Sequence, residues 1–422
     1  MREMKDSGIE WLEDIPIHWE IIPNKWIMKK KKEICSTYHG EDILSLTMNG
    51  VIIRDLTAGG KMPATFDGYQ RLTAGNLLMC LFDIDVTPRC IGLIKNDGLS
   101  SPAYSQFVLN EKGYAPYYYY YYLNLDHTKE LLHMAKNLRH SLTEDQLGEI
   151  SVAVPPYEEQ IRIVDALEEK LPQVDHLITN VQAQIDKLKA YKQSLITEVV
   201  TKGLDPSAPM KDSGVDWIGE IPMHWNIVAT KYLFEIFSGA TPKSEIIANW
   251  DGNIIWITPA DYKTDDVFVS CGRRNLSEQG FASCSTSIIP ANSIIFSKRA
   301  PIGAVAINTV ELCTNQGCLS CVNKDESNIN AKFFYYVMAI ATEHYELLGS
   351  GTTFKEISAS NFANFVLPWP AIDEQIAMVE YLDDKCTMIA QLIAIKQKKI
   401  NKLTEYKKSI IYEYVTGKKE VS

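Results

Sequence analysis

Basic, amide and hydroxyl side chains on turns between expected strands are the residues of this chain best suited to chemistry. Such groups hydrogen-bond to phosphates and to the edges of nucleic-acid bases. Most single surface lysines are only solvated charges, so the adjacent pair Lys298-Arg299, on a turn followed by Pro and Gly, is the strongest candidate. The full set of candidate DNA contacts is Thr241, Lys243, Ser297, Lys298, Arg299, Asn315, Gln316, Arg71, Ser101 and Tyr104.

Motifs for catalysis or metal binding are missing or incomplete. Cys318 and Cys321 form the only CxxC, in a strand-like run where residues three apart point to opposite faces, so we expect structural cysteines and no metal site. There is no phosphate-binding GxxxxGK[ST] loop and no GxGxxG. Val154-Pro155-Pro156-Tyr157 resembles the Pro-Pro-Tyr of amino-methyltransferases, but Val154 stands where those enzymes carry Asn or Asp. We therefore expect no catalytic residues on this chain.

The tyrosine run at 117–122 has two interpretations. It could form a stacking platform for single-stranded nucleic acid. The equivalent run in the second half, Phe333 to Met338, is aromatic and aliphatic, which favours a helix with one face in the core.

Composition is typical of a soluble globular protein. The chain has 422 residues, 46% hydrophobic and 23% charged, which predicts two or three domains. We expect no membrane span and no secretory signal, and hence a cytoplasmic protein. The net charge of −11 argues against a stand-alone, charge-driven DNA binder, so a DNA role would need local basic sites and help from a partner.

The chain repeats itself. Met4-Lys-Asp-Ser-Gly recurs at Met210, and Ile15-Pro-Ile-His-Trp recurs at Ile221 as Ile-Pro-Met-His-Trp. Downstream, Glu159-Gln-Ile recurs at Glu374. The blocks between these frames differ, which indicates one scaffold carrying two different inserts.

A long heptad seam follows each insert. Apolar residues recur at steps of four and three, and Lys192 and Lys407 fill equivalent seam positions. We expect the two helical arms to pair as an antiparallel coiled coil, although amphipathic helices packed on their own domains remain an alternative. Pro172 predicts that residues 158–170 form a separate short helix. The expected interface residues are Val174, Ile178, Val181, Ile185, Leu188, Leu195, Ile389, Ile393, Ile400, Leu403 and Ile410.

Together these motifs make the chain similar to the specificity (S) subunits of type I restriction-modification systems. The resemblance covers almost the whole chain and depends on the order and duplication of modest motifs. They are the two Ile-Pro-x-His-Trp frames, the Glu-Gln-Ile helix starts, Trp256-Ile-Thr-Pro259, Arg299-Ala300-Pro-Ile-Gly303, Cys313-Thr-Asn-Gln-Gly317 and Gly349-Ser-Gly-Thr352-Thr353. The first insert matches these motifs less well than the second.

The resemblance implies a fold and a role. The fold would be α/β (α+β), with target-recognition domains at 1–155 and 204–370 and helical spacers at 156–203 and 371–417. The two heads would read the halves of a bipartite, asymmetric double-stranded DNA target. The arms would set the spacing of the heads and dock two modification (methyltransferase) subunits, which restriction (translocase and nuclease) subunits would join. S-adenosylmethionine, Mg and ATP would bind those partners, with no cofactor on this chain.

Two other functions stay open. The first is a DNA methyltransferase or nuclease acting alone; the missing motifs oppose it, and S-adenosylmethionine binding by the purified chain would favour it. A coiled-coil adaptor that touches only protein would leave DNA association of the complex unchanged when Lys298 and Arg299 are lost.

Overall fold

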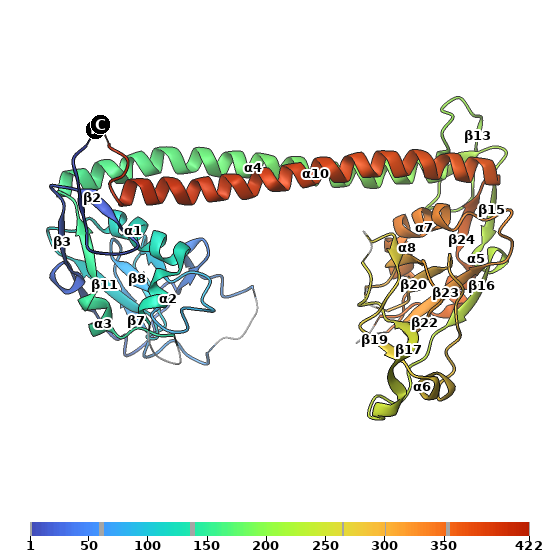
Figure 1. The fold of residues 1–422 in the computed structure, drawn as a ribbon, viewed down its shortest axis with the longest axis horizontal. Coiled ribbons are helices and arrows are strands. Elements are labelled where there is room, and N and C mark those ends of the chain that lie inside the picture. The colour runs from blue at the N-terminus through green and yellow to red at the C-terminus, as the bar shows by residue number, and fades with distance from the viewer. Residues whose placement is uncertain are drawn as a thin grey trace. The chain divides into compact units, whose positions relative to one another are not determined.

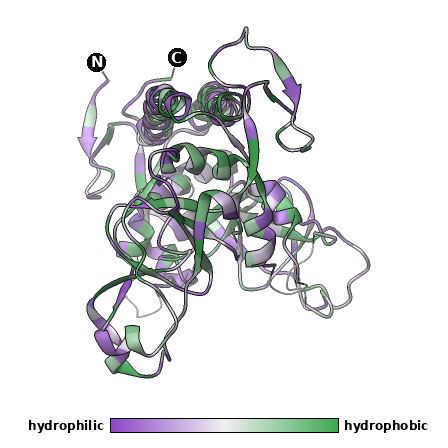
Figure 2. Ribbon diagram, turned by 90° about the vertical axis from the view of Figure 1, so that its right-hand side faces the viewer, coloured by the Kyte–Doolittle hydropathy of each residue, from purple (hydrophilic) through white to green (hydrophobic). Residues whose placement is uncertain are grey.

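The heptad seams form two long helices, α4 (Tyr157–Lys202) and α10 (Ile372–Val415). A computed structural model describes residues 2–58, 63–135, 140–263, 266–299, 301–351 and 355–421. Residues 1–182 and 397–422 form unit 1, and residues 183–396 form unit 2. Each unit therefore holds one globular head, part of α4 and part of α10. Figure 2 views both long helices almost end-on, and each carries hydrophilic and hydrophobic residues, as an amphipathic helix does.

Within each unit, α4 and α10 lie side by side and run antiparallel (Figure 1). In unit 1, Lys407 Nζ donates to Asp175 Oδ1 at 2.6 Å. In unit 2, Lys396 Nζ donates to Gln184 Oε1 at 2.5 Å, and farther along α4, Leu195 borders the same cavity as Tyr381. The expected interface residues are buried (Val174, Val181, Ile185, Leu195, Ile389, Ile410) or half-buried (Ile178, Leu188, Ile393, Ile400, Leu403).

The prediction of a helix break at Pro172 is wrong, because Pro172 lies inside the continuous helix α4. Proline removes one helical hydrogen bond and strains the preceding turn. Leu167, Leu171 and Val174 on either side of it all belong to the core of unit 1. We infer that this shared burial holds both halves of the helix in line.

The head of unit 1 is built on a sheet in the order β4–β11–β8–β9, with antiparallel pairs β1–β2, β3–β12, β7–β10 and β5–β6 around it. Its strands are β1 (Met4–Asp6), β2 (Asp14–Pro16), β3 (Glu20–Pro23), β4 (Met28–Lys31), β5 (Leu44–Thr47), β6 (Gly50–Ile53), β7 (Gln70–Leu72), β8 (Leu77–Met79), β9 (Ile91–Leu93), β10 (Gly98–Ser100), β11 (Ser105–Leu109) and β12 (Ser151–Val154). Its helices are η1 (Asn24–Trp26), α1 (Ala115–Thr128), α2 (Glu130–Met134) and α3 (Glu144–Glu149).

The head of unit 2 contains a sheet in the order β16–β23–β20–β21–β18 and a second sheet in the order β19–β17–β22. Its strands are β13 (Met210–Asp212), β14 (Glu220–Pro222), β15 (Asn226–Ala229), β16 (Phe234–Ser238), β17 (Trp250–Ile257), β18 (Phe268–Val269), β19 (Arg274–Leu276), β20 (Ile294–Ser297), β21 (Val305–Asn308), β22 (Cys313–Thr314), β23 (Cys318–Asn323) and β24 (Val366–Trp369). Its helices are α5 (Thr230–Leu233), η2 (Ile247–Asn249), α6 (Glu278–Ala282), α7 (Ala331–Ile340), α8 (Thr342–Leu347) and α9 (Ala359–Asn364).

The two halves repeat one structural joint, centred on the glutamine of each Glu-Gln-Ile motif. Gln160 is fully buried, accepts from Tyr114 N at 2.7 Å and donates to the carbonyls of Lys112 and Pro155. Gln375 is equally buried and makes the matching set of bonds to Asn330 N and to the carbonyls of Asn328 and Pro370. In each unit, one amide therefore ties a helix start to the end of the preceding strand and to the loop before the aromatic helix.

The aromatic runs lie in the cores. Tyr117, Tyr118, Tyr121 and Tyr122 of α1 are buried in unit 1, and the equivalent residues of α7 are buried in unit 2. The core interpretation is confirmed. The Cys318 and Cys321 side chains are also buried, in two different hydrophobic clusters, so they point to opposite faces as expected. Over the ranges that the structure describes, no helix has the length and apolar character to cross a membrane.

Candidate nucleic-acid interface

In unit 2 the structure gathers three of the predicted segments into one surface, which we call the loop cluster: residues 238–243, 297–299 and 315–317. Ala240 N donates to Thr314 O at 3.0 Å. The approach depends on Gly239, where a Cβ atom would lie 2.2 Å from that same carbonyl oxygen. The Thr241 hydroxyl then hydrogen-bonds to the Gln316 side chain. Two candidates that are 75 residues apart in sequence therefore touch.

The third segment joins the cluster through the backbone, because Lys298 N donates to Gly317 O at 2.9 Å. Ser297, at the end of β20, is fully buried and its hydroxyl donates to Arg299 O at 2.8 Å. That bond fixes the turn that carries the two cations. A direct DNA contact by Ser297 stays a prediction, and it would require this turn to move.

The remaining candidates of the cluster differ in exposure. Lys243 and Gln316 are exposed. Asn315 is half-buried, and its Oδ1 accepts from Gly317 N at 2.9 Å, so part of its amide is used to shape the turn. Thr241 is half-buried like Asn315, so Gln316 is the exposed amide of the cluster.

Sequence reasoning missed Glu356, which binds both cations of the cluster. Its two carboxylate oxygens accept from Lys298 Nζ at 2.8 Å and from Arg299 Nε at 2.7 Å. Arg299 also forms a backbone bridge with Glu356. Burial acts to raise the pKa of Glu356, but the hydrogen bonds and charges of Lys298 and Arg299 outweigh it and lower that pKa. Glu356 is thus ionised at neutral pH and holds both side chains.

Nothing in the sequence pointed to this carboxylate, because 57 residues separate it from Arg299. The motif Gly349-Ser-Gly-Thr352-Thr353 precedes Glu356, but Thr352 and Thr353 lie outside the described residues. Ala300, next to Arg299, also lies outside them. Two further exposed basic residues were also missed. The Arg273 side chain is 75% exposed beside Asp261, and the Arg274 guanidinium lies 3.8 Å from the centre of the Trp250 ring.

In unit 1 the candidates Arg71, Ser101 and Tyr104 lie on adjacent elements. Gln70, next to Arg71 on β7, donates to Ser101 O at 2.9 Å and to Tyr104 O at 2.7 Å. The structure therefore brings these candidates into one part of the head, as the β7–β10 pairing requires.

The surroundings of Arg71 are acidic. Its guanidinium lies 3.1 Å from Glu41 and 3.8 Å from Glu33, and the cavity that these residues line, of about 410 Å³, also includes Asp42 and Asp97. An incoming phosphate would meet a net negative charge there. The geometry thus favours a structural role for Arg71, and its role as a DNA contact stays a prediction.

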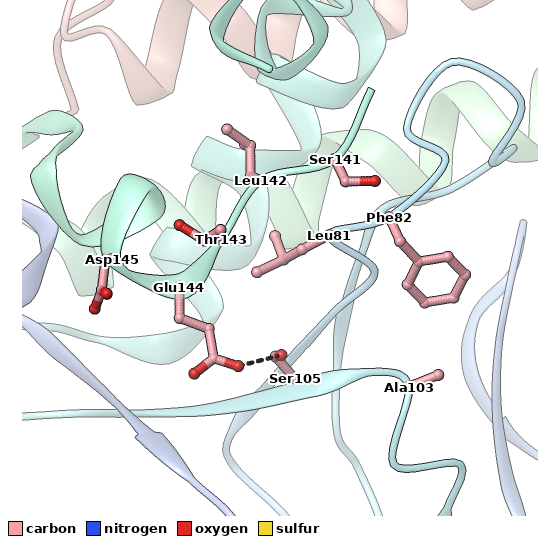
Figure 3. A pocket seen from close by; sticks show the side chains of 9 residues that line it. All are labelled: Leu81, Phe82, Ala103, Ser105, Ser141, Leu142, Thr143, Glu144 and Asp145. Carbon is pink, nitrogen blue, oxygen red and sulfur yellow. Dashed lines mark hydrogen bonds between the residues drawn. The ribbon is translucent and has the colours of Figure 1, made fainter. Parts of the chain in front are cut away.

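Ala103 and Ser105, the neighbours of Tyr104 in sequence, line a second cavity of about 430 Å³, shown in Figure 3. The Tyr104 ring stacks on Phe82 at a centroid distance of 6.2 Å, and burial raises the pKa of its hydroxyl. Glu144 and Asp145 line this cavity, and Glu144 accepts a hydrogen bond from Ser105 (Figure 3). The cavity is therefore also unsuited to phosphate, and the loop cluster of unit 2 is the better candidate interface. Among the described residues, no group of three or more His, Cys, Asp or Glu side chains is placed to hold a metal ion.

Comparison with known proteins relates this chain to type I specificity subunits. Residues 222–405 match the family described as the type I restriction modification DNA specificity domain. The chain is 35% identical over 173 residues to the type I restriction enzyme MjaIX specificity subunit of Methanocaldococcus jannaschii, a match that spans 40% of each chain. It is 27% identical to the putative MjaX specificity subunit of the same organism, over 71% of this chain and 68% of the relative.

A solved structure shares the fold. It comes from work on the structural basis of complex assembly and conformational transition of the type I R-M system. The match covers 95% of this chain and 98% of the other chain, with a TM-score of 0.73 and 16% sequence identity. The similarity of this chain to type I specificity subunits, which its motifs predicted, is confirmed, and so is the fold of two heads joined by long helices.

Proposed function

We propose that this chain, which is similar to type I specificity subunits, is the DNA-recognition subunit of a type I restriction-modification complex. Unit 2 would read one half of a split double-stranded target through its loop cluster, and unit 1 would read the other half. The chain itself would carry no catalytic residue. The observation that supports this most directly is that segments far apart in sequence, carrying Thr241, Gln316, Lys298 and Arg299, meet on one surface inside the matched specificity domain.

The partners follow from the same proposal. Two modification subunits would dock on the paired arms, and restriction subunits would join them. S-adenosylmethionine, Mg and ATP would bind those subunits. A chain of net charge −11 would rely on them for much of the grip on the DNA backbone.

The test is methylation sequencing of DNA from cells that express the neighbouring modification subunit with and without this chain. We expect a split motif that appears only when the chain is present. Lys298→Ala with Arg299→Ala should reduce methylation of that motif. The matched control is Lys231→Ala with Lys324→Ala, which also removes two exposed cations of unit 2, outside the loop cluster. Absence of any chain-dependent motif with an active partner would refute the proposal.

A protein-only adaptor is the second candidate, and one observation favours it. Lys298 and Arg299 are already paired with Glu356, so neither cation needs a DNA phosphate to neutralise its charge. This function predicts that a complex containing the Lys298→Ala, Arg299→Ala variant methylates the same motif at the wild-type level.

A further inference from the structure

The carboxylate of Glu356 is held in the way that a phosphate would be held. Lys298 Nζ reaches one oxygen and Arg299 Nε reaches the other, at 2.8 and 2.7 Å. Charge-assisted bonds of this length are the ones that such side chains also make to two oxygens of a phosphate. The side chains of Lys298, Arg299 and Glu356 are 15%, 44% and 32% exposed, so the group is partly open to solvent.

We propose that Glu356 is an internal phosphate surrogate: it occupies the place of a DNA backbone phosphate in the free protein, and bound DNA displaces it. This inference deepens the proposed DNA-recognition function and depends on it. It assigns Lys298 and Arg299 to the backbone of the target, and base reading to the neighbouring Thr241 and Gln316. Glu356 is then a positioning residue that keeps the two cations aligned and neutralised until a phosphate replaces it.

The physical consequence concerns binding to DNA of unrelated sequence. Such binding depends almost entirely on neutralised phosphates, and the logarithm of the affinity falls by about 0.9 per phosphate for each unit of log salt. A cation that is held by its own carboxylate adds nothing to this slope. In the specific complex, base contacts hold the loop cluster against the DNA, and the adjacent phosphate can then compete with Glu356. The surrogate therefore reserves Lys298 and Arg299 for the correct target.

Unit 1 offers an internal contrast. There one cation, Arg71, faces Glu41 and Glu33, with Asp42 and Asp97 in the same cavity. Removing one carboxylate leaves Arg71 surrounded by the others. Glu41→Gln thus makes the same chemical change as Glu356→Gln, at a site where no cation is released.

The experiment measures binding of the full chain, co-expressed with its modification partner, to a fluorescent duplex of random sequence at 50–200 mM salt. We expect Glu356→Gln to steepen the salt slope by about 0.9 for each phosphate gained, which is an extra three- to fourfold loss of affinity per phosphate across this range. Adding Lys298→Ala and Arg299→Ala to this variant should restore the wild-type slope. Glu41→Gln should leave the slope unchanged, as should Glu149→Gln, which releases Lys25 from an exposed pair outside the candidate sites.

A second measurement does not depend on the folding of the Glu356 variant. In the otherwise wild-type chain, Lys298→Ala with Arg299→Ala should leave the random-sequence slope unchanged but weaken binding to the methylated motif, without changing which bases are recognised. A wild-type slope in Glu356→Gln, or a lower random-sequence slope in the double alanine variant, would overturn the surrogate. If no form of the complex bound either duplex at 50 mM salt, the proposed function itself would fail.

Discussion

Replacing Ile185 by Asp tests whether the seam of the arms is packed as the structure has it. Ile185 is 2% exposed on α4. Loss of a fully buried isoleucine removes about 2–3 kcal/mol of hydrophobic stabilisation. The new carboxyl group must either be buried charged or take up a proton. At pH 7, protonating an Asp with an ordinary pKa near 3.9 costs about 4 kcal/mol, which sets the upper limit of the second contribution.

The two contributions give a total destabilisation of up to about 6–7 kcal/mol at pH 7. The pH dependence identifies its source. Burial raises the folded-state pKa of the new Asp above its unfolded value, so the penalty is present above the unfolded pKa and shrinks as the pH falls towards it. At pH 5 protonation costs only about 1.5 kcal/mol, so the variant should recover about 2.5 kcal/mol relative to pH 7.

Urea unfolding followed by circular dichroism at pH 7 and pH 5 measures both quantities. Leu177→Asp is the matched control, because Leu177 lies on the same helix and is 45% exposed; its effect should stay below about 1 kcal/mol. A small effect of Ile185→Asp at pH 7, or the same effect at both pH values, would contradict the packing of the seam. Co-purification with the modification subunit should fail in Ile185→Asp and persist in the control.

Three further predictions concern other parts of the chain. Burial, followed by the charge of Arg89, lowers the pKa of His127 to about 4; stability should therefore fall by up to about 3 kcal/mol as the pH drops from 6.5 to 4, and His127→Phe should abolish this component in urea titrations. Gln375→Leu leaves the N–H of Asn330 and the carbonyls of Asn328 and Pro370 without their partner, and should lower the free energy of unfolding of unit 2 by about 3 kcal/mol in urea titrations, with the isosteric Gln375→Glu as comparison. Deleting one heptad from each arm, residues 182–188 and 397–403, should change the gap in the methylated motif, and an unchanged gap would refute the spacer role.

The long helices and the aromatic cores could be predicted because local patterns encode them. A heptad seam needs only the spacing of apolar residues along one helix. The burial of Tyr117 followed from its equivalence with Phe333. Pro172 shows the limit of such reasoning: the local penalty is real, but burial of Leu171 and Val174, which depends on tertiary packing, decides the outcome.

The candidate interface was predictable only in part. The sequence pointed to Lys298 and Arg299 because cations on a turn have a recognisable local pattern. It could not point to Glu356, because a carboxylate among 53 acidic residues becomes distinctive only when the fold places it between two cations. The same holds for Glu41 beside Arg71. Sequence patterns can therefore point to the cations of a site. The carboxylates that neutralise them come from distant parts of the chain, so the net charge of the site depends on long-range contacts.

The duplication separates architecture from the candidate reading surface. Residues that recur in both halves make the same contacts twice: His18 meets Glu159 at 2.8 Å, and His224 meets Glu374 at 3.1 Å, while Gln160 and Gln375 tie equivalent joints. Among the described residues of unit 1 the cationic turn of the loop cluster is not repeated: β8, which takes the place of β20 in its sheet, is followed by Cys80, Leu81 and Phe82. A recurring residue is thus explained by the joint that both units need. If the proposed function holds, a difference in recognition between the two heads would originate in residues found in one unit alone, on exposed loops that the joint does not use.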